Sequence, residues 1–167
     1  MKFLLTLKSW QLFLLIWGIP FLIPLFFFES ITPTLFGTFV TIFGTIFFLW
    51  LYSIGRYLPE KLNNNIRIPT KSFQIHIWYL IITTIILSFG ALFKDVIGQS
   101  AGLLFIFIIY YFVAMFIILR YVSKLIASVE LSRLATSTDY LGYFLLIWLS
   151  PIGIWVIQPK VRRYFAK

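Results

Sequence analysis

The chain has 167 residues, of which 61% are hydrophobic, 21% aromatic and 11% charged. Its mean hydropathy is +0.98, whereas soluble domains are about half apolar and about a quarter charged. A water-soluble fold of this length could not bury so much apolar surface, so the composition predicts one membrane domain over residues 1–167. Cysteine is absent, which excludes disulfides, thiol catalysis and thiolate metal sites.

The net charge of +9 comes from 14 Lys and Arg against 5 Asp and Glu. These basic residues stand in short clusters at the ends of apolar runs, as expected if they set topology and meet anionic lipid headgroups. No basic, aromatic-interleaved soluble segment is present that could bind nucleic acid. We therefore expect membrane lipids, and no nucleic acid, among the partners.

Apolar runs of about 20 residues are long enough to cross the hydrocarbon core as helices. The sequence predicts four such spans, none with a charge inside, at about residues 10–28, 35–55, 75–93 and 103–119. The first run lacks a small-x-small cleavage site, so we interpret it as a retained helix. Pro20 and Pro24 should bend it.

A fifth run, residues 140–157, contains Pro151 and Gly153, which interrupt helices. It either crosses the membrane or enters, turns and returns to the same side. The predicted fold class is therefore all-α, a polytopic transmembrane helical bundle with four spans and a fifth, Pro/Gly-broken C-terminal segment.

Cytoplasmic loops carry the excess of Lys and Arg, so the basic clusters indicate an orientation. With a cytoplasmic N-terminus, the loop 56–73 and the segment 120–139 both lie inside. If the last segment returns, Lys94 is the single basic residue outside. Leu125, Val129 and Leu131 follow near-helical spacing, which predicts a cytoplasmic extension of the fourth helix. We expect a multi-pass protein of the cell inner membrane.

Groups suited to catalysis are few, because the carboxylates all lie in loops or at helix ends. His76 is the only histidine and stands at the start of the third span without ligand partners at a useful spacing. We therefore predict no enzyme activity, no catalytic residue, no cofactor and no metal site. The carboxylates are Glu29, Glu60, Asp95, Glu130 and Asp139.

Hydroxyl side chains recur along one face of the second span, flanked by two glycines. The residues are Thr34, Thr38, Thr41 and Thr45, with Gly37 and Gly44. Such a face either packs helices together, since small residues let backbones approach and hydroxyls bond across helices, or lines a water or ion path. Pro151 and Gly153 likewise either pack helices together or line such a path.

The stretch Ser150-Pro-Ile-Gly-Ile-Trp-Val-Ile-Gln-Pro159 and the basic residues after it resemble the C-terminal ends of small, uncharacterised bacterial polytopic membrane proteins. The resemblance is confined to this stretch and implies no activity, ligand or catalytic residue. Independently of it, we interpret Lys160, Arg162 and Arg163 as lipid-headgroup anchors.

These features predict a small membrane protein that acts by assembly. The first hypothesis is a homo-oligomeric pore, a channel-like protein or a membrane-disrupting effector. The alternative is a non-catalytic accessory or scaffolding subunit of a larger membrane complex, in which the polar face packs against a partner. A small-solute transporter is less favoured, because no span carries an acidic or basic residue near its middle.

Overall fold

The computed structural model of the protein describes residues 1–20, 22, 33–62, 66, 68–88 and 101–165. Within these ranges every regular element is a helix, which confirms the all-α class. The helices are α1 (Phe3–Thr6), α2 (Ser9–Phe13), the π-helical turn η1 (Leu14–Gly18), α4 (Pro33–Tyr57), the 3-10 turn η2 (Leu58–Lys61), α5 (Lys71–Ser88), α7 (Ala101–Leu131), α8 (Ser137–Trp148) and α9 (Ser150–Phe165).

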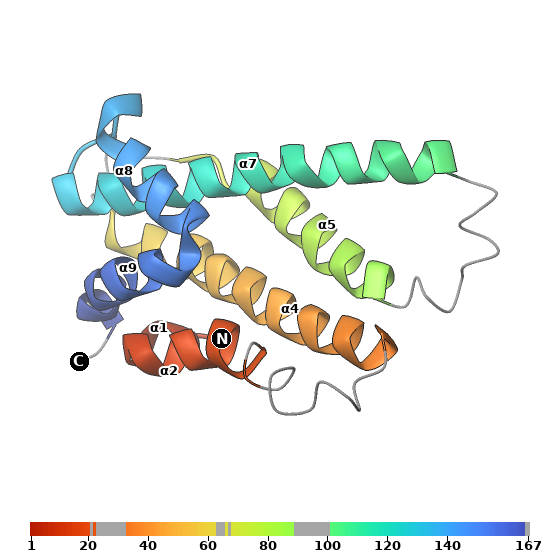
Figure 1. The fold of residues 1–167 in the computed structure, drawn as a ribbon. Helices are drawn as coiled ribbons and strands as arrows, with labels where there is room; N and C mark the ends of the chain where they lie inside the picture. The colour runs from red at the N-terminus through yellow and green to blue at the C-terminus, as the bar shows by residue number, and fades with distance from the viewer. Residues whose placement is uncertain (21, 23–32, 63–65, 67, 89–100, 166–167) are drawn as a thin grey trace.

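The long helices α4, α5 and α7 run antiparallel in chain order and spread apart toward one end (Figure 1). At the opposite end α4 and α7 finish, α5 and α8 begin, and the chain terminates. Ion pairs join the helices there, Lys2 to Glu60 at 3.7 Å and Lys160 to Glu130 at 2.9 Å. We call this end of the bundle the charged end.

Two helical stretches, Gly37–Lys61 and Phe105–Leu131, are long and apolar enough to cross a membrane. Four full spans are therefore not confirmed. The predicted span 10–28 appears as the short apolar helix Ser9–Gly18, and its remainder lies largely outside the described residues. The predicted span 75–93 is described as far as Ser88, and α5 begins with polar residues, so its described apolar part is short.

Near Pro20, where a bend is expected, the helix departs from regular α-helical geometry. Proline clashes with the carbonyl four residues earlier and cannot donate a hydrogen bond. Just before Pro20 the helix widens into η1, where the N–H of Ile19 donates to the carbonyl of Leu14, five residues back. A π-helical turn of this kind absorbs the extra space that the ring requires.

Helix α7 has 31 residues, so it is roughly 46 Å long and exceeds the bilayer's hydrocarbon core of about 30 Å. The predicted extension beyond residue 119 is confirmed. Leu125 and Val129 of the extension are buried, whereas Leu131 is exposed. The extension ends at Ser132, whose positive φ of 52° turns the chain toward α8.

The core lies toward the charged end, where α1, α2, α4, α5, α7 and α9 converge. Phe73 of α5 stacks on Tyr121 of α7 with ring centroids 4.4 Å apart. The Phe73 ring also lies directly on Gly55 of α4, where an added Cβ would overlap it. Other fully buried members of this core are Phe48, Trp50, Leu51, Ile54, Ile77, Leu80, Ile118, Val122, Leu125, Ile154 and Ile157.

The segment predicted as residues 140–157 forms a helical hairpin, not one continuous helix. Helix α8 ends at Trp148, Leu149 leaves helical geometry with ψ of 52°, and α9 begins at Ser150. Pro151 thus stands in the first turn of α9, where proline is favoured. Because α9 runs back along α8, both open ends of the hairpin lie at the charged end (Figure 1).

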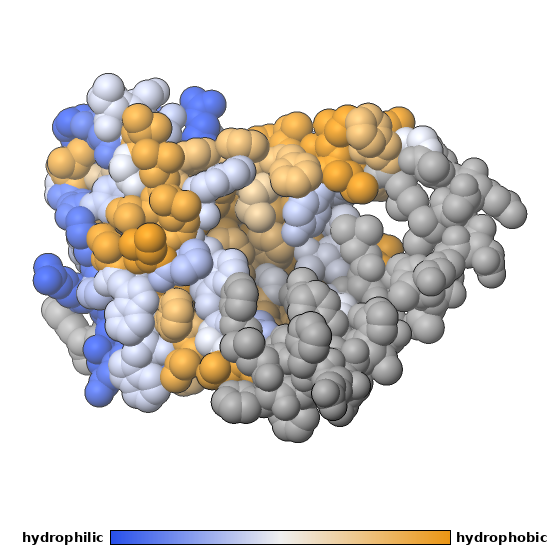
Figure 2. Space-filling view, in the orientation of Figure 1, coloured by the Kyte–Doolittle hydropathy of each residue, from blue (hydrophilic) through white to orange (hydrophobic). Residues whose placement is uncertain are grey.

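Large apolar side chains are exposed on two parts of the molecule. Six consecutive residues of α7, from Phe105 to Tyr110, are each at least 40% exposed. The outer face of the hairpin exposes Trp148, Ile152 and Trp155. Figure 2 shows hydrophilic residues gathered at the charged end, and hydrophobic ones over the hairpin and the first half of α7. Patches this large on a soluble monomer are rare and mark a contact with lipid or protein.

Candidate functional site

The threonine and glycine face lies on α4, as its spacing predicts. Thr38 is exposed, whereas Gly37, Thr41 and Thr45 are half-buried. The hydroxyl of Thr41 donates to the carbonyl of Gly37 at 2.8 Å, so it is bonded within its own helix. Thr34 belongs to α4, but its side chain lies outside the described residues.

Gly44 lies at the contact between α4 and α5. A Cβ added there would stand 3.4 Å from the Cγ2 methyl of Thr84. The Thr84 hydroxyl is in turn 3.2 Å from the hydroxyl of Tyr111 on α7. The 3.4 Å distance to the Thr84 methyl is an ordinary van der Waals contact, so Gly44 packs beside a polar link between α5 and α7 at a place where a methyl group would also fit.

At Gly153 the backbone of α9 lies directly against the backbone of α8. A Cβ at residue 153 would overlap the carbonyl oxygen of Leu146, so any side chain would force the two helices apart. The Gly153 N–H donates to the Leu149 carbonyl at 2.9 Å, which closes the turn. Pro151 is exposed beside it. Together these residues form the hairpin turn.

Sequence reasoning missed Gln158, a fully buried amide in α9. Its Oε1 accepts from Trp50 Nε1 of α4 at 2.9 Å. Its Nε2 donates to the carbonyls of Leu4 and Leu7, at 3.0 and 2.9 Å. Because buried polar groups are costly unless paired, these three bonds hold α9, α4 and the N-terminal segment in one arrangement. A lone glutamine in an apolar stretch was the available signal.

The basic residues of the tail have different surroundings. Lys160 Nζ lies 2.9 Å from Glu130 Oε1 and 2.6 Å from the hydroxyl of Tyr143, which itself donates to Glu130. Arg162 is half-buried, and its Nε makes no hydrogen bond to the described part of the chain. Arg163 is exposed. Lys160 thus links α9 to α7 and α8, and Arg163 faces outward.

At the start of α8, Asp139 closes the α7–α8 connection. Its carboxylate accepts two bonds from the Arg133 guanidinium, at 2.8 and 3.1 Å. It also accepts from the backbone N–H of Thr136 at 2.8 Å, as in a capping box. The Arg133 bonds, followed by those from Thr136, lower the pKa of Asp139 to about 2.

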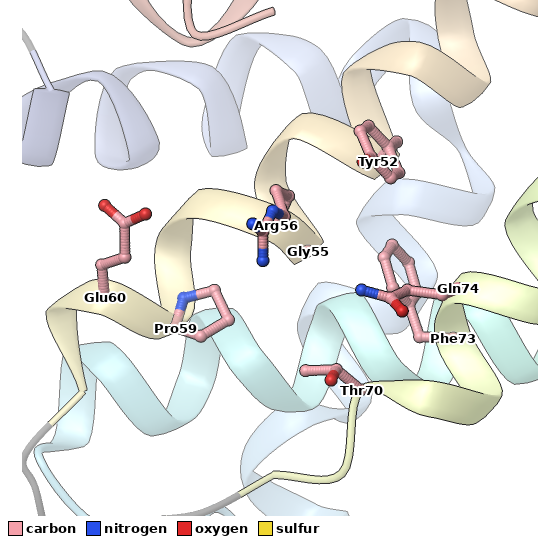
Figure 3. A pocket seen from close by; sticks show the side chains of 8 residues that line it. All are labelled: Tyr52, Gly55, Arg56, Pro59, Glu60, Thr70, Phe73 and Gln74. Atoms are coloured by element: carbon pink, nitrogen blue, oxygen red, sulfur yellow. The ribbon is translucent and has the colours of Figure 1, made fainter.

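A pocket of about 300 Å³ opens at the charged end, between the end of α4 and the start of α5 (Figure 3). Arg56 and Pro59 line it from the α4 and η2 side, and Thr70 and Gln74 line it from the α5 side. In the sequence, the feature that corresponds to this pocket is the basic loop between the second and third predicted spans. The remaining lining residues are Tyr52, Gly55, Glu60 and Phe73.

His76 stands on the first turns of α5. Its Nδ1 lies 2.6 Å from the Ser72 carbonyl, and its ring centroid is 6.0 Å from that of Tyr110. Among the described residues, no group of three His, Asp or Glu side chains is placed to hold a metal ion.

Comparison of the chain with protein-family models, with curated proteins and with solved structures finds no match in any of the three. The function must therefore be argued from the geometry above.

Proposed function

We propose that the chain is a multi-pass protein of the cell inner membrane, with its charged end and N-terminus in the cytoplasm. The observation that carries this proposal is the division of the surface into an exposed apolar part and a charged end. Only 22% of the most apolar stretch of α7 is buried inside the protein, whereas the core helix of a soluble protein is mostly buried. Lipid is the medium that suits so much exposed apolar surface.

The α8–α9 hairpin, on this proposal, enters the membrane from the cytoplasm and returns. Its tip carries the exposed apolar side chains Trp148, Ile152 and Trp155. A turn at membrane depth must satisfy its backbone groups internally. In this turn the Leu149 N–H donates to the Leu145 carbonyl at 2.8 Å, and the N–H groups of Ile152 and Gly153 donate to the Leu149 carbonyl.

Within the membrane the protein acts as a non-catalytic subunit that assembles with other membrane helices. Phe48, Trp50 and Leu51, which follow the threonine face along α4, are buried in the core, and the Thr41 hydroxyl is bonded within its helix. Gly37 is half-buried and Thr38 is exposed on the outside of α4, between bulkier neighbours. In lipid, small residues are the places where helices of two molecules approach closely.

The test is the mass of the purified protein in detergent, compared between wild type and Gly37→Leu. We expect an assembly larger than a monomer, or a complex with a co-purified membrane protein, that Gly37→Leu weakens. Gly102→Leu is the matched control, because an added Cβ at this exposed glycine meets no atom within 4 Å. A wild-type monomer without a partner would contradict the proposal.

The homo-oligomeric pore is a second candidate, favoured by the exposure of Thr38 on the same outer face of α4. Copies arranged around an axis could bring this face of each α4 to a central path. Thr41→Val keeps the side-chain shape and removes the hydroxyl. It should change ion flux through reconstituted liposomes more than stability, because the hydroxyl is bonded to the Gly37 carbonyl within its own helix. An intact oligomer that passes no ions would contradict the pore.

A further inference from the structure

The pocket at the charged end combines a cavity, an arginine and polar side chains. Arg56 lines it, and its guanidinium forms no ion pair or hydrogen bond with the described residues. We propose that this pocket binds the phosphate group of an anionic phospholipid from the cytoplasmic leaflet. The inference rests on the proposed insertion into the membrane, and it adds a specific ligand site to it.

The chemistry around Arg56 suits a phosphate. A guanidinium binds phosphate oxygens with two parallel N–H groups, which makes arginine an effective phosphate ligand. The side chains of Thr70 and Gln74 supply further donors from the opposite wall (Figure 3). Glu60 also lines the pocket, but its carboxylate lies 3.7 Å from Lys2 Nζ, so a neighbouring cation balances its charge.

An apolar surface continues from the pocket along α5. It could contact the acyl chains of a lipid, which free phosphate lacks. Tyr52 of the pocket packs against Trp78 of α5, with ring centroids 5.7 Å apart, and Trp78 is 46% exposed. Tyrosine and tryptophan favour the membrane interface. Farther along α5 toward the apolar end, Ile82 and Ile86 are exposed, 53% and 60% respectively. A phospholipid with its phosphate at Arg56 could lay its acyl chains along this apolar strip.

The size and charge of the site favour an anionic headgroup. The cavity of about 300 Å³ has room for more than a bare phosphate ion. Lys71 is exposed next to Thr70 of the pocket wall. Its charge, with that of Arg56, would repel a choline group, whereas it would attract a headgroup of glycerol phosphate type.

The experiment measures lipid binding to the full-length protein in neutral detergent. Native mass spectrometry would count retained dioctanoyl phosphatidylglycerol in a titration, beside dioctanoyl phosphatidylcholine and inorganic phosphate. Arg56→Gln removes the guanidinium at an exposed position. Arg120→Gln removes the same charge from an exposed position on α7 outside this pocket, and is the matched control.

We expect wild type to retain phosphatidylglycerol in preference to phosphatidylcholine. Arg56→Gln should weaken this binding roughly tenfold, as loss of a charge-assisted hydrogen bond implies, and Arg120→Gln should change it little. Equal losses in both variants would show diffuse attraction and overturn the site. Binding of inorganic phosphate as tight as that of the lipid would overturn the lipid assignment.

Extraction of the expressed protein from membranes with alkaline carbonate separates this inference from the proposed function. Both variants should stay in the membrane fraction like wild type. If wild type is extracted, the proposed insertion fails first. If wild type is retained but phosphatidylglycerol binds no better than phosphatidylcholine, the pocket assignment alone fails.

Discussion

Gln158 joins parts of the chain that are far apart in sequence. Its amide contacts Trp50 of α4 on one side and the carbonyls of Leu4 and Leu7 on the other, and it is fully buried. An amide offers both a donor and an acceptor, so one side chain can satisfy the indole N–H and two carbonyls. Removing the amide leaves the Trp50 indole N–H and the Leu4 and Leu7 carbonyls without this partner. The free-energy cost of such unpaired buried groups exceeds the net stabilisation that the hydrogen bonds provide.

Gln158→Met should therefore destabilise the protein by about 2 kcal/mol, because the volume is kept while the hydrogen bonds are lost. The measurement is denaturant unfolding in detergent, followed by tryptophan fluorescence. Val156→Met, on the exposed side of the same helix, is the control and should have little effect. Equal unfolding midpoints for Gln158→Met and wild type would show that the amide network adds no stability.

The Asp139 carboxylate makes the stability of the folded protein depend on pH. The bonds from Arg133 and then Thr136 lower its pKa from 3.8 to about 2. A lowered pKa means that the folded state stabilises the charged form, so this contribution is present above about pH 4. It is lost as the pH falls toward 2. The unfolding midpoint of wild type minus that of Asp139→Asn should shrink over this range, and a constant difference would contradict the assignment.

In the α8–α9 hairpin, a proline and a glycine have different roles in the turn. Pro151 stands where a helix can begin, and Gly153 lets α9 lie against the backbone of α8 at Leu146. The polar links of Lys160 to Glu130 then fasten the returning helix to α7. The hairpin therefore depends on backbone proximity at its tip and on charge at its open end.

Gly153→Ala should destabilise the hairpin by about 1–3 kcal/mol, because even one methyl group would overlap the Leu146 carbonyl. Gly142→Ala in α8 is the control in the same hairpin. An added Cβ there meets no atom within 4 Å, so we expect a gain of about 0.5–1 kcal/mol from improved helix propensity. Thermal unfolding and protease sensitivity near residue 149 would test both. If Gly153→Ala unfolds at the same temperature as wild type, the close packing of α9 on α8 is contradicted.

For the whole molecule, the arrangement of charge and apolar surface decides orientation. The hairpin returns the chain to the charged end, so nearly all basic residues can lie on one side of a membrane, as topology rules favour. If residues 140–157 crossed the membrane once, Lys160 and Arg163 would lie on the opposite side. In the structure Lys160 instead pairs with Glu130 of α7.

The cysteine-free chain allows a direct test with single cysteines labelled from either side of the membrane. We expect Lys71→Cys and Tyr164→Cys, both exposed at the charged end, to label from the cytoplasm, and Gly102→Cys to label from the other side. Ile152→Cys at the hairpin tip should resist water-soluble reagents. Labelling of Tyr164→Cys from the side of Gly102→Cys would mean that the last segment crosses.

Composition and local pattern were sufficient to predict the helical class, the positions of α4 and α7, the extension of α7 and the break near Pro151. These follow from hydropathy and backbone chemistry within one stretch of chain. Four full spans are not confirmed, because apolar length alone does not fix where a helix ends. The partners of Gln158, Lys160 and Gly153 and the pocket at Arg56 were decided by the tertiary structure. Each depends on which helices converge at the charged end, and a single sequence does not encode those distances in any local pattern.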